Sequence, residues 1–116
     1  MIDLDPRHLD LVRRILAQNV PHCEVWMFGS RVSGQVKEYS DIDLVIIGKA
    51  RLDFDTLRSL REAFVDSVLP MRVDVLDWHA TSEAFRDVIL EAGYEVLQRA
   101  PDVAGNDTET TVEGER

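Results

Sequence analysis

Two spacings of apolar residues alternate along residues 1–100 of this 116-residue chain. Apolar residues three or four positions apart, the period of a helix with one buried face, mark three stretches. Short runs rich in β-branched and aromatic residues lie between them and predict strands. The elements we expect are helices over about residues 6–18, 53–68 and 81–92, a short helical segment at 30–34, and strands at 23–28, 41–47, 71–78 and 94–98. Helices and strands that take turns in this way predict an α/β (α+β) fold, in which helices pack on a small mixed β-sheet.

Local signals mark where these elements begin and end. Asp5 precedes Pro6, and this pair is typical of the N-cap and first position of a helix. Pro70 stops the second long helix, and Gly93 ends the third. The strand at 94–98 is expected at an edge of the sheet. In the second long helix we expect one apolar face, made of Phe54, Leu57, Leu60, Phe64, Val65 and Val68.

Residues 101–116, PDVAGNDTETTVEGER, differ in composition from the rest of the chain. Five acids accompany one arginine, and only two valines are available for packing. Such a segment cannot bury enough apolar surface to offset the entropy lost on ordering it. We therefore expect one folded domain over residues 1–100 and a disordered acidic tail over 101–116.

Net charge limits the kinds of partner that this protein can bind, and cysteine content indicates its cellular compartment. A formal charge of −9 argues against direct binding to nucleic acid, which needs clustered Lys and Arg, but it is compatible with a nucleotide and its metal ions. Cys23 has no second cysteine to pair with, and we expect it to be a small buried residue at a strand start. No apolar run approaches the roughly 18–20 residues of a membrane span, and the first residues lack the features of a signal peptide. These features predict a cytoplasmic protein without a membrane segment.

Two aspartates stand in the strand expected at 41–47. Side chains alternate faces along a strand, so Asp41 and Asp43 point the same way, roughly 7 Å apart at the Cβ atoms. Like charges at this spacing favour a cation between them, and Mg²⁺ accepts one or two carboxylates together with waters and phosphate oxygens. A site for a pair of divalent cations is one interpretation. The alternatives are that Asp41 caps a turn after Ser40, or that the acids face water at a sheet edge.

A third aspartate is placed to join this pair. In RVDVLDW, Val73 and Val75 share one face of the expected strand, and Asp74 lies alone among apolar neighbours on the other. If that strand lies beside the strand at 41–47, Asp74 joins the two other acids. Asp77, near the strand end and on the opposite face, is expected to cap the following helix.

The Gly-Ser turn after the first strand has the features of a phosphate-binding loop. Gly29 and Gly34 allow the backbone to approach a ligand closely, and Ser30 offers a hydroxyl and an amide at the start of a short helix. Arg31 adds charge to the phosphate site or, as an equal alternative, faces solvent. The loop lacks the Gly-Lys-Ser/Thr ending of a Walker A motif and the G-x-G-x-x-G of a dinucleotide site.

Together, GSRVSG, SDIDL and RVDVLD resemble the pattern of the nucleotidyltransferase superfamily of polymerase-beta type, which is Gly-Ser, then Asp-x-Asp, then a third Asp on a later strand. The resemblance covers about residues 22–78. Each of the three acids and the Gly-Ser pair has its match. The short chain is similar in particular to the minimal nucleotidyltransferase (MNT) branch, and the resemblance implies the nucleotidyltransferase fold.

The same resemblance implies two-metal nucleotidyl transfer. Asp41 and Asp43 would bridge both Mg²⁺ ions, and Asp74 would hold the catalytic ion and help to deprotonate or orient an attacking hydroxyl. Gly29 and Ser30 would seat the phosphates of ATP. Alignment and charge neutralisation are what phosphoryl transfer mostly needs, and these residues would supply both.

The MNT branch also implies a partner. Its usual associate is a small all-helical HEPN protein, typically an RNase toxin, and similar MNT proteins act as antitoxins that transfer AMP to a tyrosine of that toxin. A chain of 116 residues has no room for an acceptor-binding domain, so the acceptor should come from another molecule. Two alternatives are a binding module that blocks the toxin without chemistry, and transfer to a small-molecule hydroxyl.

Overall fold

The computed structural model describes residues 2–33 and 41–100. Every helix and strand expected from the sequence is present in these ranges. The elements are α1 (Pro6–Asn19), β1 (Glu24–Phe28), α2 (Ser30–Ser33), β2 (Ile42–Ile47), α3 (Phe54–Val65), β3 (Val73–Asp77), the 3-10 helix η1 (Trp78–Ala80), α4 (Glu83–Ala92) and β4 (Tyr94–Gln98). Among the helices of the described part, none has the length and apolar character needed to cross a membrane.

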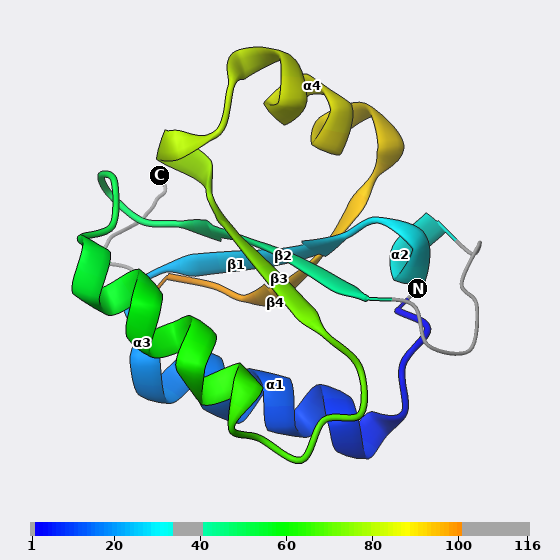
Figure 1. The fold of residues 1–116 in the computed structure, drawn as a ribbon. Coiled ribbons are helices and arrows are strands. Elements are labelled where there is room, and N and C mark those ends of the chain that lie inside the picture. Colours follow the sequence, from blue (N-terminus) through cyan, green and yellow to red (C-terminus); the bar gives the residue numbers. More distant parts are fainter. Residues whose placement is uncertain (1, 34–40, 101–116) are drawn as a thin grey trace, which may run out of the picture.

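The four strands form one mixed sheet in the order β3-β2-β1-β4 (Figure 1). β1 pairs antiparallel with β2 and β4, whereas β2 and β3 are parallel. Parallel neighbours need a crossover connection, and α3 with its flanking loops provides it. β4 lies at an edge, as predicted, and β3 forms the other edge. The expected fold class is confirmed.

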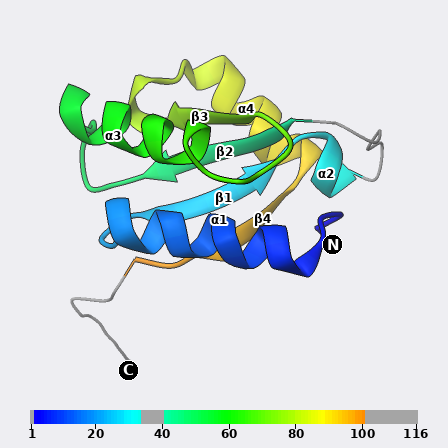
Figure 2. The same cartoon turned by 60° about the horizontal axis from the view of Figure 1, so that its bottom comes forward.

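Helices cover both faces of this sheet. α1 and α3 lie side by side on one face, and α4 lies over the other (Figures 1 and 2). The main core fills the space under α1 and α3. Its fully buried members are Val12, Leu16, Val25, Met27, Ile42, Leu44, Ile46 and Leu60. Because strand side chains alternate, burial of Leu44 toward α1 and α3 places Asp43 on the opposite face, toward α4.

Side-chain caps explain why the three long helices begin where they do. Asp5, Asp53 and Ser82 are the N-caps of α1, α3 and α4, and each accepts a hydrogen bond from a backbone N–H two or three residues further on. Such a bond satisfies one of the free N–H groups of a helix start. Gly93 ends α4 with a φ of 102°. The predicted start of α1 at Pro6 and the predicted end of α4 at Gly93 are therefore confirmed.

The expected single apolar face of α3 is wrong in part. α3 ends at Val65, and Phe54, Val65 and Val68 are 77%, 81% and 86% exposed. Successive helix residues are about 100° apart, so burial of Phe64 turns Val65 away from the core. Leu60 shares the buried face with Phe64. Three large apolar side chains are thus left at the surface on or just after α3.

Candidate active site

One residue from each strand joins a row across the sheet face that α4 covers. The register pairs Tyr94 with Phe28, Phe28 with Asp43, and Asp43 with Asp74. The prediction that β3 lies beside β2 and brings Asp74 to the acid pair is confirmed. The alternative of a water-facing edge is wrong for Asp43, because β2 is an inner strand.

Arg72 is a fourth charged residue, and it lies beside Asp41 and Asp74. The Ile42 N–H donates to the carbonyl of Arg72 at 2.9 Å, next to the parallel ladder, which brings residue 72 beside residue 41. Arg72 Nη2 lies 3.1 Å from Asp41 Oδ2 and 3.5 Å from Asp74 Oδ2. The acid group, defined as Asp41, Asp43 and Asp74, therefore has one arginine paired with two of its members.

The electrostatics of the acid group show an excess of negative charge. Burial first, then the charges of Asp74 and Asp41, raises the pKa of Asp43 to about 6, and Arg72 opposes this. Asp74 and then Asp41 raise the pKa of Arg72. The negative charges of Asp74 and Asp41 contribute to both shifts, because carboxylates repel a further carboxylate and attract a cation. An added cation would lower the free energy of the ionised group.

Gly29 is required by the position of Asp43. Gly29 has a φ of 85°, which side chains other than glycine rarely adopt, and a Cβ there would overlap Asp43 Oδ2. The carbonyl of Gly29 accepts a hydrogen bond from the Val32 N–H at 3.0 Å, which closes the first turn of α2. The group that lies close to Gly29 is the carboxylate of Asp43. Contact of Gly29 with a phosphate stays a prediction.

The other predicted phosphate contacts have different outcomes. Ser30 begins α2, and Gly34 lies outside the described residues. Arg31 is only 6% exposed, so the solvent-facing alternative is wrong. Its Nη1 donates to the carbonyl of Asp3 at 2.8 Å, and its own carbonyl accepts from the Asp3 N–H at 2.8 Å. Arg31 thus fastens α2 to the N-terminal segment, and a phosphate-binding role for Ser30, Arg31 and Gly34 stays a prediction.

A cleft of about 720 Å³ lies beside the acid group. Asp43, Asp74 and Arg72 line it together with the rings of Phe28 and Phe85. The two rings meet edge to face with centroids 6.1 Å apart, which holds α4 on the sheet next to the acids. The volume is within the range of about 300–1,000 Å³ that small-molecule sites occupy. The cleft therefore has the size of a small-molecule site, with a mixed apolar and charged lining.

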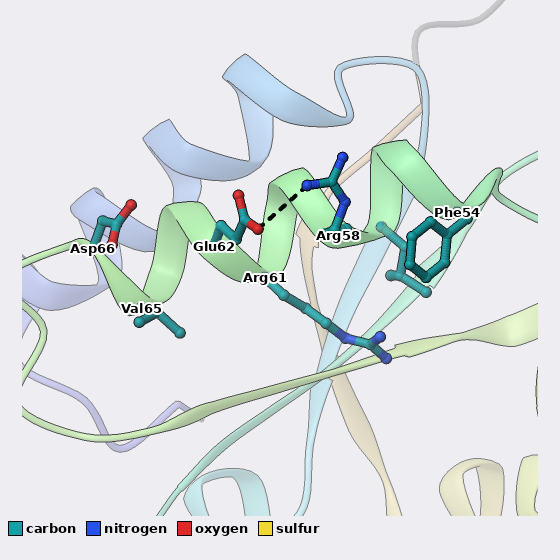
Figure 3. A pocket seen from close by; sticks show the side chains of 7 residues that line it. Phe54, Arg58, Arg61, Glu62, Val65 and Asp66 are labelled. Atoms are coloured by element: carbon teal, nitrogen blue, oxygen red, sulfur yellow. Dashed lines mark hydrogen bonds and ion pairs between the residues drawn. The ribbon is translucent and has the colours of Figure 1, made fainter.

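The cleft continues into a second hollow along α3. Figure 3 shows Arg61 and Val65 on the side of α3 that faces β3, and both residues line the cleft as well as this hollow. Arg61 Nη2 donates to the carbonyl of Val75 at 2.9 Å, across the free edge of β3. The exposed side chain of Phe54 lines the same hollow. The acid site is thus continuous with a partly apolar surface on α3.

Asp77 has the structural role expected of it. It is the N-cap of η1, is 4% exposed, and accepts hydrogen bonds from the His79 N–H at 3.0 Å and from the Leu52 N–H at 2.8 Å. Cys23 lies nearby and is buried, as predicted, and burial raises the pKa of its thiol. Both residues support the sheet away from the acid group.

The acid group has the donor chemistry of a Mg²⁺ site. It offers carboxylate oxygens, the hard ligands that Mg²⁺ prefers, and the charges of Asp74 and Asp41 add to burial in raising the pKa of Asp43. Across residues 2–33 and 41–100, no three Asp, Glu, His or Cys side chains converge tightly enough to hold a metal ion as they lie. Asp41 and Asp74 instead form ion pairs with the Arg72 guanidinium. The carboxylate donors suit a metal ion in their chemistry, while the guanidinium of Arg72 lies where it pairs with two of them.

Sequence reasoning missed Arg72 and the aromatic lining of the cleft. A signal for Arg72 was present, because residues 72 and 74 share a face by alternation and residue 41 would lie opposite residue 72 in a parallel pair. Phe28 directly precedes the Gly-Ser turn and gave no such signal. Phe85 reaches the site only through the packing of α4 on the sheet.

Residues 11–102 match the family model described as "Polymerase beta, Nucleotidyltransferase". The match spans most of the chain, and the protein belongs to this nucleotidyltransferase family. The resemblance found in GSRVSG, SDIDL and RVDVLD is confirmed.

Individual relatives and solved structures give a more specific likeness. The chain is 50% identical over 97 residues, 84% of each chain, to the "Probable protein adenylyltransferase MntA" of Haemophilus influenzae. It resembles a chain in a crystal structure of a toxin–antitoxin with AMP-PNP, with a TM-score of 0.64 and 23% identity over 77% of this chain and 71% of the other. A complex of tri-AMPylated Shewanella oneidensis HEPN toxin with MNT antitoxin gives a TM-score of 0.56 and 22% identity, with the same coverage. At these identities the solved structures support the fold.

Proposed function

We propose that this protein is a Mg²⁺-dependent adenylyltransferase that transfers AMP from ATP to a tyrosine hydroxyl of a HEPN partner protein, and thereby acts as the antitoxin of that partner. The observation that carries the proposal is the position of Asp41, Asp43 and Asp74 side by side on two neighbouring strands, with Asp43 against Gly29 and with Asp43 and Asp74 lining one cleft. The identity with the MntA adenylyltransferase supports AMP as the group transferred. The related complexes of MNT antitoxin with HEPN toxin support the partner. The proposal includes a cytoplasmic location, where ATP is available.

The residues of the cleft would divide the chemistry among them. Two Mg²⁺ ions, when bound, supply charge neutralisation at the triphosphate. Asp41 and Asp43 would hold both ions, and Asp74 would hold one of them and orient the attacking hydroxyl or take its proton. The hydroxyl oxygen forms a bond to the α-phosphorus, the bond to the bridging oxygen of the β-phosphate breaks, and pyrophosphate leaves with the electron pair. Gly29 and Ser30 would hold the phosphates in line.

A protein acceptor fits the open side of the cleft. The cleft runs into the hollow along α3, where Phe54 is 77% and Val65 81% exposed. Phe54 and Val65 lie at opposite ends of α3, and Leu57 also lines the hollow between them; an exposed surface with several apolar side chains is typical of a protein interaction site. A folded partner that covers this surface would complete the cleft next to the acid group, which supports a macromolecular acceptor over a small molecule.

Transfer of label from ATP tests the proposal. The purified protein is incubated with Mg²⁺, ATP labelled at the α-phosphate, and a purified HEPN protein as the candidate partner. Label is expected on the partner with the unchanged protein and with Asp10→Asn, and to be lost with Asp43→Asn. Asp10 is a matched control, because it lies on α1, pairs only at the surface with Arg14, and loses the same charge.

The alternatives give different results in the same experiment. If Asp43→Asn still neutralises the partner and neither protein transfers label, the protein acts by binding alone. If label moves to a small hydroxyl compound without any partner, the acceptor class is wrong while the nucleotidyl transfer stands.

A further inference from the structure

The positively charged side chain of Arg72 lies directly beside the acid group. The parallel pairing of Ile42 with Val73 places Arg72 opposite Asp41, one position before the paired Asp43 and Asp74. The bond from the Ile42 N–H to the Arg72 carbonyl holds this backbone in place. Three acids and one arginine therefore form a two-by-two block on the face of two adjacent strands.

A single guanidinium nitrogen serves two acids in this block. Arg72 Nη2 is 3.1 Å from Asp41 Oδ2 and 3.5 Å from Asp74 Oδ2. The Arg72 side chain is 72% exposed, and the side chains of Asp41 and Asp74 are 38% and 47% exposed. The guanidinium thus lies on the solvent side of the group. It can leave without opening the core, since solvent already surrounds most of it.

A metal ion would need the carboxylates that Arg72 holds. Asp41 and Asp74 are both expected metal ligands, and a dication among them would repel the guanidinium. A triphosphate in the cleft would offer that guanidinium new oxygens, and an arginine fork binds phosphate as readily as carboxylate. Arg72 lines the cleft and is therefore placed to make the exchange.

We propose that Arg72 is a resident counter-ion, which holds Asp41 and Asp74 when no metal is bound and moves to the triphosphate when metal and nucleotide arrive together. The inference rests on the proposed function only for the nature of the ligand, a divalent cation with a nucleoside triphosphate. Metal alone has to displace the guanidinium with nothing to receive it. The site therefore favours the metal–nucleotide complex over the free metal ion.

Binding of Mn²⁺, measured by electron paramagnetic resonance, tests this inference without any transfer reaction. The dissociation constant of Mn²⁺ is measured with and without AMP-PNP for the unchanged protein, for Arg72→Gln and for Arg72→Lys. In Arg72→Gln we expect Mn²⁺ alone to bind about three- to tenfold tighter, the size expected when two surface ion pairs with a competing cation are removed. The Mn²⁺–AMP-PNP complex should bind several-fold more weakly. Arg72→Lys keeps the charge but loses the two-pronged guanidinium, and its dissociation constants should lie between those of the unchanged protein and of Arg72→Gln.

A matched control separates this effect from a general change of charge. Arg14→Gln removes the same charge and a 2.8 Å ion pair with Asp10, on α1, which packs on the other face of the sheet. It should leave both dissociation constants within twofold of the unchanged protein. Thermal unfolding checks that each variant is folded.

Each other result overturns the inference. If Arg72→Gln binds Mn²⁺ alone with unchanged affinity, Arg72 does not compete with metal, even if AMP transfer proceeds normally. If Arg72→Gln increases the affinity for Mn²⁺ alone and for the Mn²⁺–AMP-PNP complex by the same factor, Arg72 does not move to the triphosphate. If the unchanged protein and both Arg72 variants fail to bind Mn²⁺ with or without AMP-PNP, the metal site itself is wrong, and the proposed function fails with it.

Discussion

Replacing Asp43 by asparagine should make the metal-free protein more stable at alkaline pH. The pKa of Asp43 is raised from 3.8 to about 6, because burial and the charges of Asp74 and Asp41 disfavour its ionised form. The folded state therefore binds this proton more tightly than the unfolded state does. The resulting cost is fully present above about pH 6 and disappears as the pH falls toward 4.

The size of this effect follows from the pKa. The difference between 3.8 and about 6 corresponds to about 3 kcal/mol for a group shielded from water. Asp43 borders an open cleft, so solvent screening reduces the effect, and we expect Asp43→Asn to raise the free energy of unfolding by about 1–2 kcal/mol at pH 8. The same substitution should change it by less than about 0.5 kcal/mol at pH 4.

Urea unfolding in a metal chelator at pH 8 and pH 4 measures both values. Asp10→Asn is the control, because Asp10 is exposed and pairs with Arg14 at the surface, and its effect should stay within about 0.5 kcal/mol at both pH values. Addition of Mg²⁺ at pH 8 should stabilise the unchanged protein and leave Asp43→Asn unaffected. A loss of stability in Asp43→Asn at pH 8 would refute the reasoning, because it would show that the ionised carboxylate stabilises the fold.

Three further substitutions probe the frame of the site. Gly29→Ala should abolish binding of Mn²⁺–AMP-PNP and destabilise the protein by more than about 1 kcal/mol, because of the positive φ and the overlap with Asp43. Isothermal calorimetry measures the binding, and urea unfolding measures the stability. Unchanged binding would contradict the close packing of Gly29 against Asp43. Asp77→Ala should cost about 2–4 kcal/mol in unfolding free energy, since it leaves the N–H groups of Leu52 and His79 without their acceptor, and a cost below about 1 kcal/mol would contradict this. Ser82→Ala should cost about 1 kcal/mol through loss of the α4 cap, and no change in urea midpoint would contradict it.

Local chemistry made most of the elements predictable. Asp5 and Pro6 set the start of α1, and Gly93 sets the end of α4, because each acts within one turn of its own position. Alternation along a strand placed Asp43 and Asp74 away from the core, since that rule needs no knowledge of neighbours. These predictions depend on a few consecutive residues.

What the sequence left open depends on long-range packing. The spacing of Val65 in α3 matched a buried face, but only the position of α3 against α1 and the sheet decides how wide the buried arc is. The same holds for Arg31, whose burial depends on the N-terminal segment returning to α2. The role of Arg72 became visible only with the parallel register of β2 and β3.

The central claim is that the acid group transfers AMP to a partner protein. Mass spectrometry of the intact HEPN partner, purified after co-expression with the unchanged protein, with Asp10→Asn and with Asp43→Asn, tests it most directly. The account predicts a partner whose mass rises by one or more AMP residues, located on tyrosine by peptide fragmentation, with the first two proteins and not with the third. An unmodified partner that is nevertheless neutralised equally by all three proteins would contradict the account.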